Sequence, residues 1–325
     1  MTQRSTELLM TEDSGWYFPS VKRDPERYLQ SCPESVCQWL RNLKESGKVL
    51  LLITSSHSDY CRLVCEHILG KDFEDLFDVI ITNALKPGFF SLIPHQRPFR
   101  TLVNDVESGT GLSCLEKRGW FSQGNWPHLH DLLKSLTSKQ QPKVVYFGDS
   151  MRSDMFPAFT FAKWETVMIV EEMEAEGMAT EKHQSSASNQ SSTSNQSSAY
   201  SQISASNQSS TSNQSSASNQ SSAYNQGPAE KKGKFAECMK APSAVSQQWG
   251  SYFVDVQTDE AGQERHTLTW CCSCIHKYSS VAIPSVESIA ALPLNFQFKR
   301  FSEGQSCTTG YYPSPPHSLL KRAES

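Results

Sequence analysis

Four short apolar runs punctuate the first half of the chain, at residues 48–53, 77–82, 143–147 and 165–170. They are rich in Val, Ile and Leu and have no alternating polar positions, which is typical of strands covered on both faces in a parallel sheet. The run at 48–53, KVLLLI, has this character most clearly. We therefore predict that these runs are strands of a buried, mainly parallel sheet.

Amphipathic stretches separate these runs. The first begins at Ser31, which has capping-box spacing to Glu34, and ends at Gly47. Two more helices are predicted at 59–69 and 126–136. Strands that alternate with helices over residues 31–171 predict an α/β fold with a mainly parallel sheet and right-handed crossovers. The apolar stripe of the first helix consists of Val36, Trp39, Leu40 and Leu43.

Other segments have a weaker β pattern. Residues 89–93 (FFSLI) and 99–103 (FRTLV) are possible strands, and residues 249–256 and 266–283 alternate as strands do. Within 266–283 lies a group of possible zinc ligands, but their spacing is too compact for the usual two pairs. On a strand three of them share one face, which predicts ordinary packing. The group consists of Cys271, Cys272, Cys274 and His276.

Seven near-copies of a polar hexad such as SSASNQ fill residues 185–226. The few apolar residues in these hexads form no amphipathic face that could be buried, so the segment is predicted to be a disordered insertion. The predicted organisation is an irregular N-terminus at 1–30, a core at 31–178, a disordered linker at 179–247, a C-terminal part of the core at 248–301 and a disordered tail at 302–325.

Composition and charge limit the classes of partner that we expect and the location of the protein. The formal net charge is -4 with no long run of either sign, so neither a nucleic-acid footprint nor a polybasic membrane patch is indicated. No window of about 18 apolar residues exists and the N-terminus has no apolar signal region, so we expect a cytoplasmic protein. The ten cysteines are scattered among apolar runs, which favours reduced buried thiols over a disulfide framework.

Side chains with phosphate and metal chemistry follow the predicted strands. Thr54 and Ser55 come after the first run, Lys86 after the second, and Asp149 with Asp154 after the third. Carboxyl ends of strands are where open α/β sheets bind ligands. A hydroxyl, an ammonium and an acidic pair would suit a phosphate with Mg²⁺. Taken one at a time, each residue also has an ordinary structural explanation. Thr54 could cap a helix, Lys86 could be a solvated loop lysine, and Asp154 could be a surface carboxylate.

Their joint order resembles that of a known family. The pattern LLLIT at 50–54, Lys86-Pro87 followed by Phe89-Phe90, and YFGD at 146–149 through Asp154 is similar to motifs two, three and four of the haloacid dehalogenase superfamily. It resembles more narrowly the cytosolic purine 5'-nucleotidase family. The likeness includes the turn Gly124-Asn125, the segment WET at 164–166, and the residues from 249–256 to 292–302.

The resemblance implies a haloacid-dehalogenase-like Rossmannoid fold and a magnesium-dependent phosphohydrolase that converts a nucleoside monophosphate, or another phosphomonoester, to an alcohol and phosphate. Thr54 and Ser55 would bind the phosphoryl group, and Lys86 would steady the nucleophile and the phosphate charge. Asp149 would ligate Mg²⁺, and Asp154 would support the metal site. The nucleophile in that family is an aspartate that forms a phosphoryl-enzyme.

This sequence departs from the family at that nucleophile. The family has a DxDxT motif at the end of its first core strand, and nothing between Met1 and Ile53 has that form. Residues 1–30 would then be the end of the cap domain, and the chain a truncated product that lacks the central strand. We expect impaired hydrolysis, with a non-catalytic binding or regulatory protein as the alternative. The substrate and the oligomeric state stay open.

Overall fold

The computed structural model describes residues 16–178, 250–302, 304 and 306–324. The whole predicted linker at 179–247, with the hexads at 185–226, lies outside this part of the chain, as do residues 1–15. Within the described part, the N-terminal segment predicted to be irregular forms two short helices, α1 (Tyr17–Arg23) and α2 (Pro25–Tyr28). Val21 on α1 is fully buried, so this segment packs against the rest of the fold.

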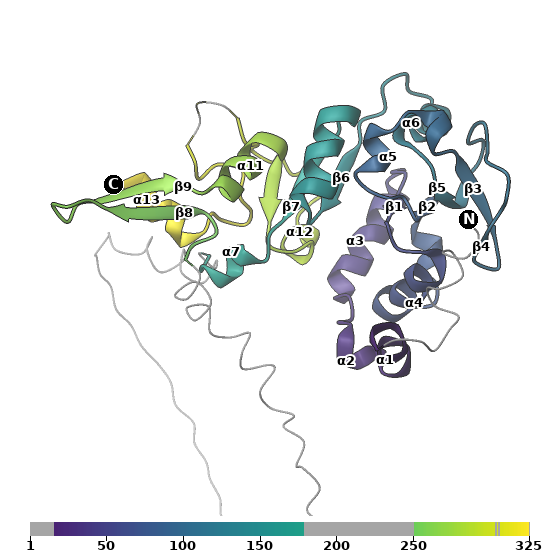
Figure 1. Ribbon diagram of the computed structural model, residues 1–325, viewed down its shortest axis with the longest axis horizontal. Coiled ribbons are helices and arrows are strands. Elements are labelled where there is room, and N and C mark those ends of the chain that lie inside the picture. The colour runs from purple at the N-terminus through teal and green to yellow at the C-terminus, as the bar shows by residue number, and fades with distance from the viewer. Residues whose placement is uncertain (1–15, 179–249, 303, 305, 325) are drawn as a thin grey trace, which may run out of the picture. The chain divides into compact units, whose positions relative to one another are not determined.

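A five-stranded sheet has the order β1-β2-β5-β3-β4 (Figure 1). β1, β2 and β5 are parallel, and β3 joins β5 antiparallel. These strands confirm the predictions at 48–53, 77–82 and 99–103. The bounds are β1 Leu51–Ile53, β2 Val79–Thr82, β3 Phe99–Val103, β4 Val106–Glu107 and β5 Gly119–Gln123.

A second sheet has the order β10-β7-β6, and its strands are all parallel. β6 is Val145–Gly148, β7 is Glu165–Ile169 and β10 is Val281–Ile283. A separate antiparallel hairpin joins β8 (Val254–Thr258) to β9 (Glu264–Leu268). The fold is thus α/β, with mostly parallel strands flanked by helices, as predicted.

The five-stranded and the three-stranded sheet share one hydrophobic core. Its buried side chains include Ile53 and Ile81 from the first sheet and Met168 and Ala282 from the second. In the described residues, β1 ends the first sheet and β6 ends the second. Leu51 and Leu52 on β1 are only half-buried. Both faces of β1 nevertheless have apolar contacts, as predicted, because Leu51 packs against this core and Leu52 packs against a second cluster that contains Cys61 and Cys65. What β1 does not have, in the described residues, is a neighbouring strand on its other edge.

The three predicted helices are present as α3 (Glu34–Glu45), α4 (Ser58–Leu69) and α6 (Trp126–Thr137). α3 starts directly after Pro33, and no side chain caps it, so the capping box predicted from Ser31 does not form. The backbone before it is instead tied to α4, since the Cys32 N–H donates to the Ile68 carbonyl at 2.9 Å. No helix in the described residues is long and apolar enough to cross a membrane.

Short helices complete the described fold. They are η1 Phe73–Leu76, α5 Gly88–Ser91, η2 Pro94–Gln96, the π-helical turns η3 Met151–Met155 and η4 Ala158–Ala162, α7 Glu172–Ala175, α12 Glu287–Ala290 and α13 His317–Glu324. The strand predicted at 89–93 is wrong because α5 begins there, after Pro87, whose fixed φ suits a helix start. Its residues Phe89 and Phe90 are both buried in the core.

The strand predicted across 266–283 is also wrong in its middle. Residues Trp270–Tyr278 form the helix α11, whose start is capped by the Thr269 hydroxyl accepting the Cys272 N–H at 3.1 Å. Cys272 and His276 therefore lie one helical turn apart, and Cys274 is on a different face. The structure contains no group of three or more metal-ligating side chains anywhere in its described residues.

The tail predicted to be disordered from 302 is ordered where it is described. Tyr311 and Leu319 are buried, and Tyr311 forms a parallel bridge with Ala282. The Pro-rich composition of this segment led to the prediction of disorder, although it contains a few apolar side chains that pack on the core. α13 therefore belongs to the folded body of the protein.

Candidate functional site

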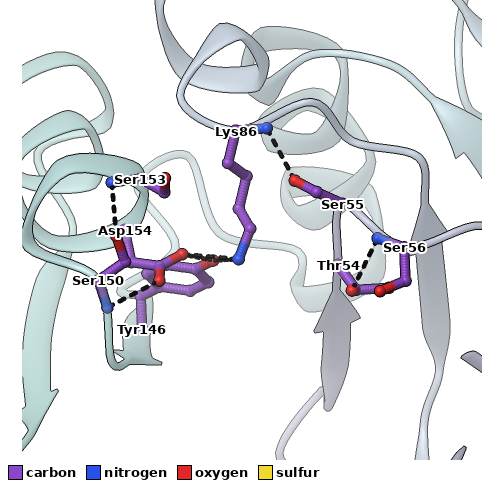
Figure 2. A network of polar contacts seen from close by, with 8 residues as sticks. All are labelled: Thr54, Ser55, Ser56, Lys86, Tyr146, Ser150, Ser153 and Asp154. Carbon is purple, nitrogen blue, oxygen red and sulfur yellow. Dashed lines mark hydrogen bonds and ion pairs between the residues drawn. The ribbon is translucent and has the colours of Figure 1, made fainter. Parts of the chain in front are cut away.

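Loops at the carboxyl ends of β1, β2 and β6 carry the predicted site residues (Figure 2). Thr54 and Ser55 directly follow β1. The Thr54 hydroxyl accepts the Ser56 N–H at 3.1 Å, and the Ser55 hydroxyl accepts the Lys86 N–H at 3.0 Å. A side chain after one strand thus fixes the backbone after the neighbouring strand.

Lys86 extends from the loop after β2 toward the end of β6 (Figure 2). Its Nζ lies 2.6 Å from Oδ1 of Asp154 and 3.2 Å from the hydroxyl of Tyr146. The Lys86 side chain is 15% exposed, so its ammonium is largely shielded but still reachable. The two parallel sheets are therefore linked at their carboxyl edge by an ion pair.

The Asp154 carboxylate is buried and has three polar partners. It lies on the π-helical turn η3 and is 2% exposed. Besides Lys86, its carboxylate accepts the Tyr146 hydroxyl at 2.9 Å and the Ser150 N–H at 3.2 Å. These contacts leave little of the carboxylate for a metal, and they identify Asp154 as the anchor of the Lys86 ammonium.

Gly148 makes room for this carboxylate. A Cβ at position 148 would lie 2.6 Å from Cβ of Asp154 and 2.7 Å from its Cγ. Real Cβ atoms essentially never come so close. The last residue of β6 is therefore restricted to glycine as long as Asp154 lies against the strand end.

Tyr146 is a site residue that the sequence reasoning missed. It is buried on β6, where the rings of Phe90 and Trp164 pack against it, both with centroids 5.7 Å or less from its own. Burial, followed by the charge and hydrogen bond of Asp154, raises the pKa of Tyr146. The phenol therefore stays protonated and donates a hydrogen bond to Asp154. The sequence signal that could have identified Tyr146 is a hydroxyl-bearing side chain within an otherwise apolar strand.

Asp149 follows β6 directly and is exposed. Among the described residues its carboxylate makes no hydrogen bond or ion pair, so its oxygens are free to accept. The structure thus brings together Ser55, Lys86 and Asp154, and it leaves Asp149 open on the surface beside them. An ammonium, two hydroxyls and an open carboxylate near one sheet edge can bind a phosphate and a hard divalent cation.

Comparison with known proteins identifies the family to which the chain belongs. The model of the 5' nucleotidase family matches residues 11–300. The chain is 51% identical over 308 residues to human "5'-nucleotidase domain-containing protein 1". The matched region covers 94% of the chain and 59% of that protein. The bovine protein of this name is 50% identical over 307 residues, or 94% and 58% of the two chains. Human "5'-nucleotidase domain-containing protein 2" is 35% identical over 166 residues, 50% of this chain and 30% of that protein. The chain therefore spans less than two thirds of the length of these relatives.

Proposed function

The chain belongs to the 5' nucleotidase family, as its motifs predicted, and on this basis we propose that it carries a magnesium-dependent site for a phosphomonoester, with nucleoside monophosphates as the ligand class. The observation that supports the proposal best is the Lys86 ammonium, held at the carboxyl edge between the ends of β1, β2 and β6. A cation in this position neutralises phosphate charge.

The role proposed for each residue depends on which of its hydrogen-bonding atoms remain available to a ligand. The hydroxyls of Thr54 and Ser55 would donate to phosphate oxygens, since a hydroxyl that accepts one bond still has its own proton to give. Lys86 would face the phosphate while it stays paired with Asp154. Asp154 then supports the site through Lys86, and its contact with a metal would have to be indirect.

Asp149 is the side chain best suited to hold Mg²⁺. Its carboxylate is exposed and without a partner in the described residues, and Mg²⁺ typically binds one or two carboxylates together with phosphate oxygens and water. When bound, the ion would neutralise phosphate charge and orient the phosphoryl group. The donor set therefore fits this metal, with the phosphate as the second source of oxygen ligands.

We also propose that hydrolysis is impaired in this chain. The given sequence contains no DxDxT, the motif that carries the nucleophile in the family that it resembles. Both β1 and β6 end their sheets in the described residues, and Val145 on β6 is 56% exposed although it is apolar. A further strand between them would need a gap of about 9.6 Å, twice the ordinary spacing, and would cover these edges. Such a strand is where the missing carboxylates would belong.

Phosphate release tests both parts of the proposal. The purified, folded chain is incubated with a panel of nucleoside monophosphates and an aryl phosphate, with Mg²⁺ and with a chelator. Asp149→Ala is compared with Asp131→Ala, which removes an exposed carboxylate from α6. Little or no release by the folded chain is expected. Turnover that requires Mg²⁺ and is lost only in Asp149→Ala would show that another carboxylate serves as nucleophile. Turnover that is equal in both variants would overturn the assignment of Asp149.

A non-catalytic binding or regulatory protein is the second candidate. It is favoured by the same absence of DxDxT, together with a Lys86 ammonium that already has a carboxylate partner. This candidate requires that nucleoside monophosphates bind to the folded chain without being hydrolysed. Binding measured beside phosphate release therefore separates the two functions.

A further inference from the structure

The loop that carries Lys86 has a backbone that must be held in place. Asn83 and Leu85 have φ of 47° and 52°, in the left-handed region that residues other than glycine rarely adopt. Each such residue persists only when its surroundings determine it. Two of them within three residues indicate that contacts outside the loop fix its course.

Those contacts converge on Asn83. Its Nδ2 donates to Oε1 of Glu107 at 2.7 Å. Nη2 of Arg97 donates to the Asn83 backbone carbonyl and, at 3.1 Å, to its Oδ1. The donor, the acceptor and the carbonyl of one residue are thus bound by two side chains of opposite charge. Hydrogen bonds to charged groups are the stronger kind in proteins.

Glu107 is itself fixed. Besides Asn83, it accepts a hydrogen bond from the Ser122 hydroxyl at Oε1 and one from Nε2 of Gln123 at 2.6 Å at Oε2. Burial alone would raise the pKa of Glu107, but these hydrogen bonds and the charge of His57 outweigh burial and lower it. The carboxylate therefore stays ionised and offers acceptors to three donors at once.

Arg97 is anchored from its other end. Its backbone carbonyl accepts Nδ2 of Asn125 at 3.0 Å, and Asn125 also caps α6 by accepting the His128 N–H at 3.1 Å. The clamp is tied in addition to the loop after β1, because the Asn83 N–H donates to the Ser56 carbonyl at 2.7 Å. One residue thus connects the loop of Lys86 with the loop of Thr54 and Ser55.

We propose that Glu107 and Arg97 are positioning residues, which fix Asn83 and thereby aim the Lys86 ammonium at the phosphate position. Neither of them touches that position. That Lys86 meets a phosphate there rests on the proposed function, whereas the clamp on the loop does not. Glutamine at position 107 weakens the clamp, because it removes the negative charge that strengthens these hydrogen bonds and places an amide where one carboxylate oxygen accepts.

The test compares Glu107→Gln with Glu34→Gln, a matched change to a carboxylate that binds the Arg41 guanidinium on the surface. Three properties of the folded proteins are measured: hydrogen exchange at the Lys86 amide, the NMR signal of the Lys86 ε-methylene, and affinity for inorganic phosphate with Mg²⁺. Lys86→Arg assigns the ε-methylene signal. We expect Glu107→Gln to speed exchange roughly 10-fold or more, to shift the signal and to weaken phosphate binding, with Glu34→Gln unchanged.

Asn83→Gly provides a second route if Glu107→Gln does not fold. Glycine adopts the left-handed backbone freely but has no amide for Glu107 and Arg97, so it removes the clamp without adding strain. Asn83→Gly alone should speed exchange at the Lys86 amide and shift the Lys86 ε-methylene signal, and an unchanged amide and signal would overturn the clamp. Where Glu107→Gln does fold, it should have no further effect on the Lys86 amide in the Asn83→Gly background. Additive effects of the two changes would overturn the clamp.

The outcomes separate the two proposals. Unchanged exchange and an unchanged Lys86 signal in a folded Glu107→Gln protein would overturn the positioning role, whatever the phosphate affinity. Faster exchange in this variant, together with a wild-type chain that binds no phosphate, would support the clamp and contradict the proposed function.

Discussion

Replacing Asp154 with Asn tests the ion pair that joins the two sheets. The change removes the negative charge opposite Lys86 Nζ, 2.6 Å away, and leaves the shape of the side chain almost unaltered. Removing one member of a fully buried ion pair typically costs about 3–5 kcal/mol, because the other charge stays buried without a partner. Lys86 is 15% exposed and can be partly hydrated, so we expect a loss near the lower end, about 2–4 kcal/mol in the free energy of unfolding.

The assay is urea unfolding followed by circular dichroism. With a slope of about 2 kcal/mol per molar urea, a loss of this size moves the midpoint by roughly 1–2 M. Asp131→Asn, which removes the exposed partner of Lys134, is the matched control and should change stability by at most about 0.5 kcal/mol. Combining Asp154→Asn with Lys86→Met should cost less than the sum of the single changes. A cost below about 1 kcal/mol, or strict additivity, would refute the buried pair.

Three further predictions concern other parts of the fold. Gly148→Ala should destabilise the protein and disturb the Asp154 contacts, because the new Cβ would lie 2.6 Å from Cβ of Asp154; an unchanged urea midpoint would contradict this. Burial lowers the pKa of His276 below its ordinary 6.5, so the unfolded chain binds a proton that the native chain does not, and the free energy of unfolding should fall as the pH drops below about 6.5. His276→Gln should flatten this dependence between pH 7.5 and 5.5, and an equal slope in both proteins would count against it. Burial raises the pKa of Cys272 to about 11, so iodoacetamide at pH 8 should label exposed Cys114 well before Cys272, and equal labelling by mass spectrometry would disprove the burial.

The sequence predicted the strands and the loops of the site well, since both depend on local patterns. Continuous apolar runs identified β1, β2, β6 and β7, and the polar residues directly after them identified Thr54, Lys86 and Asp149. Parallel strands bring their carboxyl ends to one edge, so these residues could be expected near one another. How each side chain is partnered does not follow from such patterns, so the ion pair between Asp154 and Lys86 could not be predicted.

The clamp on Asn83 could not be predicted from the chain. Its members come from three separate segments, and Glu107 lies on β4, a strand of two residues with no periodicity to detect. α11 was missed for a different reason. The threonines before it and its cysteine-rich start alternate as a strand does, and only the hydroxyl of Thr269 at the cap distinguishes it as a helix.

Calorimetric titration of the folded chain with a nucleoside monophosphate, in the presence of Mg²⁺, tests the central claim most directly. The wild-type protein is compared with Asp149→Ala and with the same titration in a chelator. The account predicts saturable binding that is weakened at least about 10-fold by the chelator and by the substitution, since each removes the metal from the phosphate. Absence of binding to a folded chain, or equal affinity in all three titrations, would contradict it.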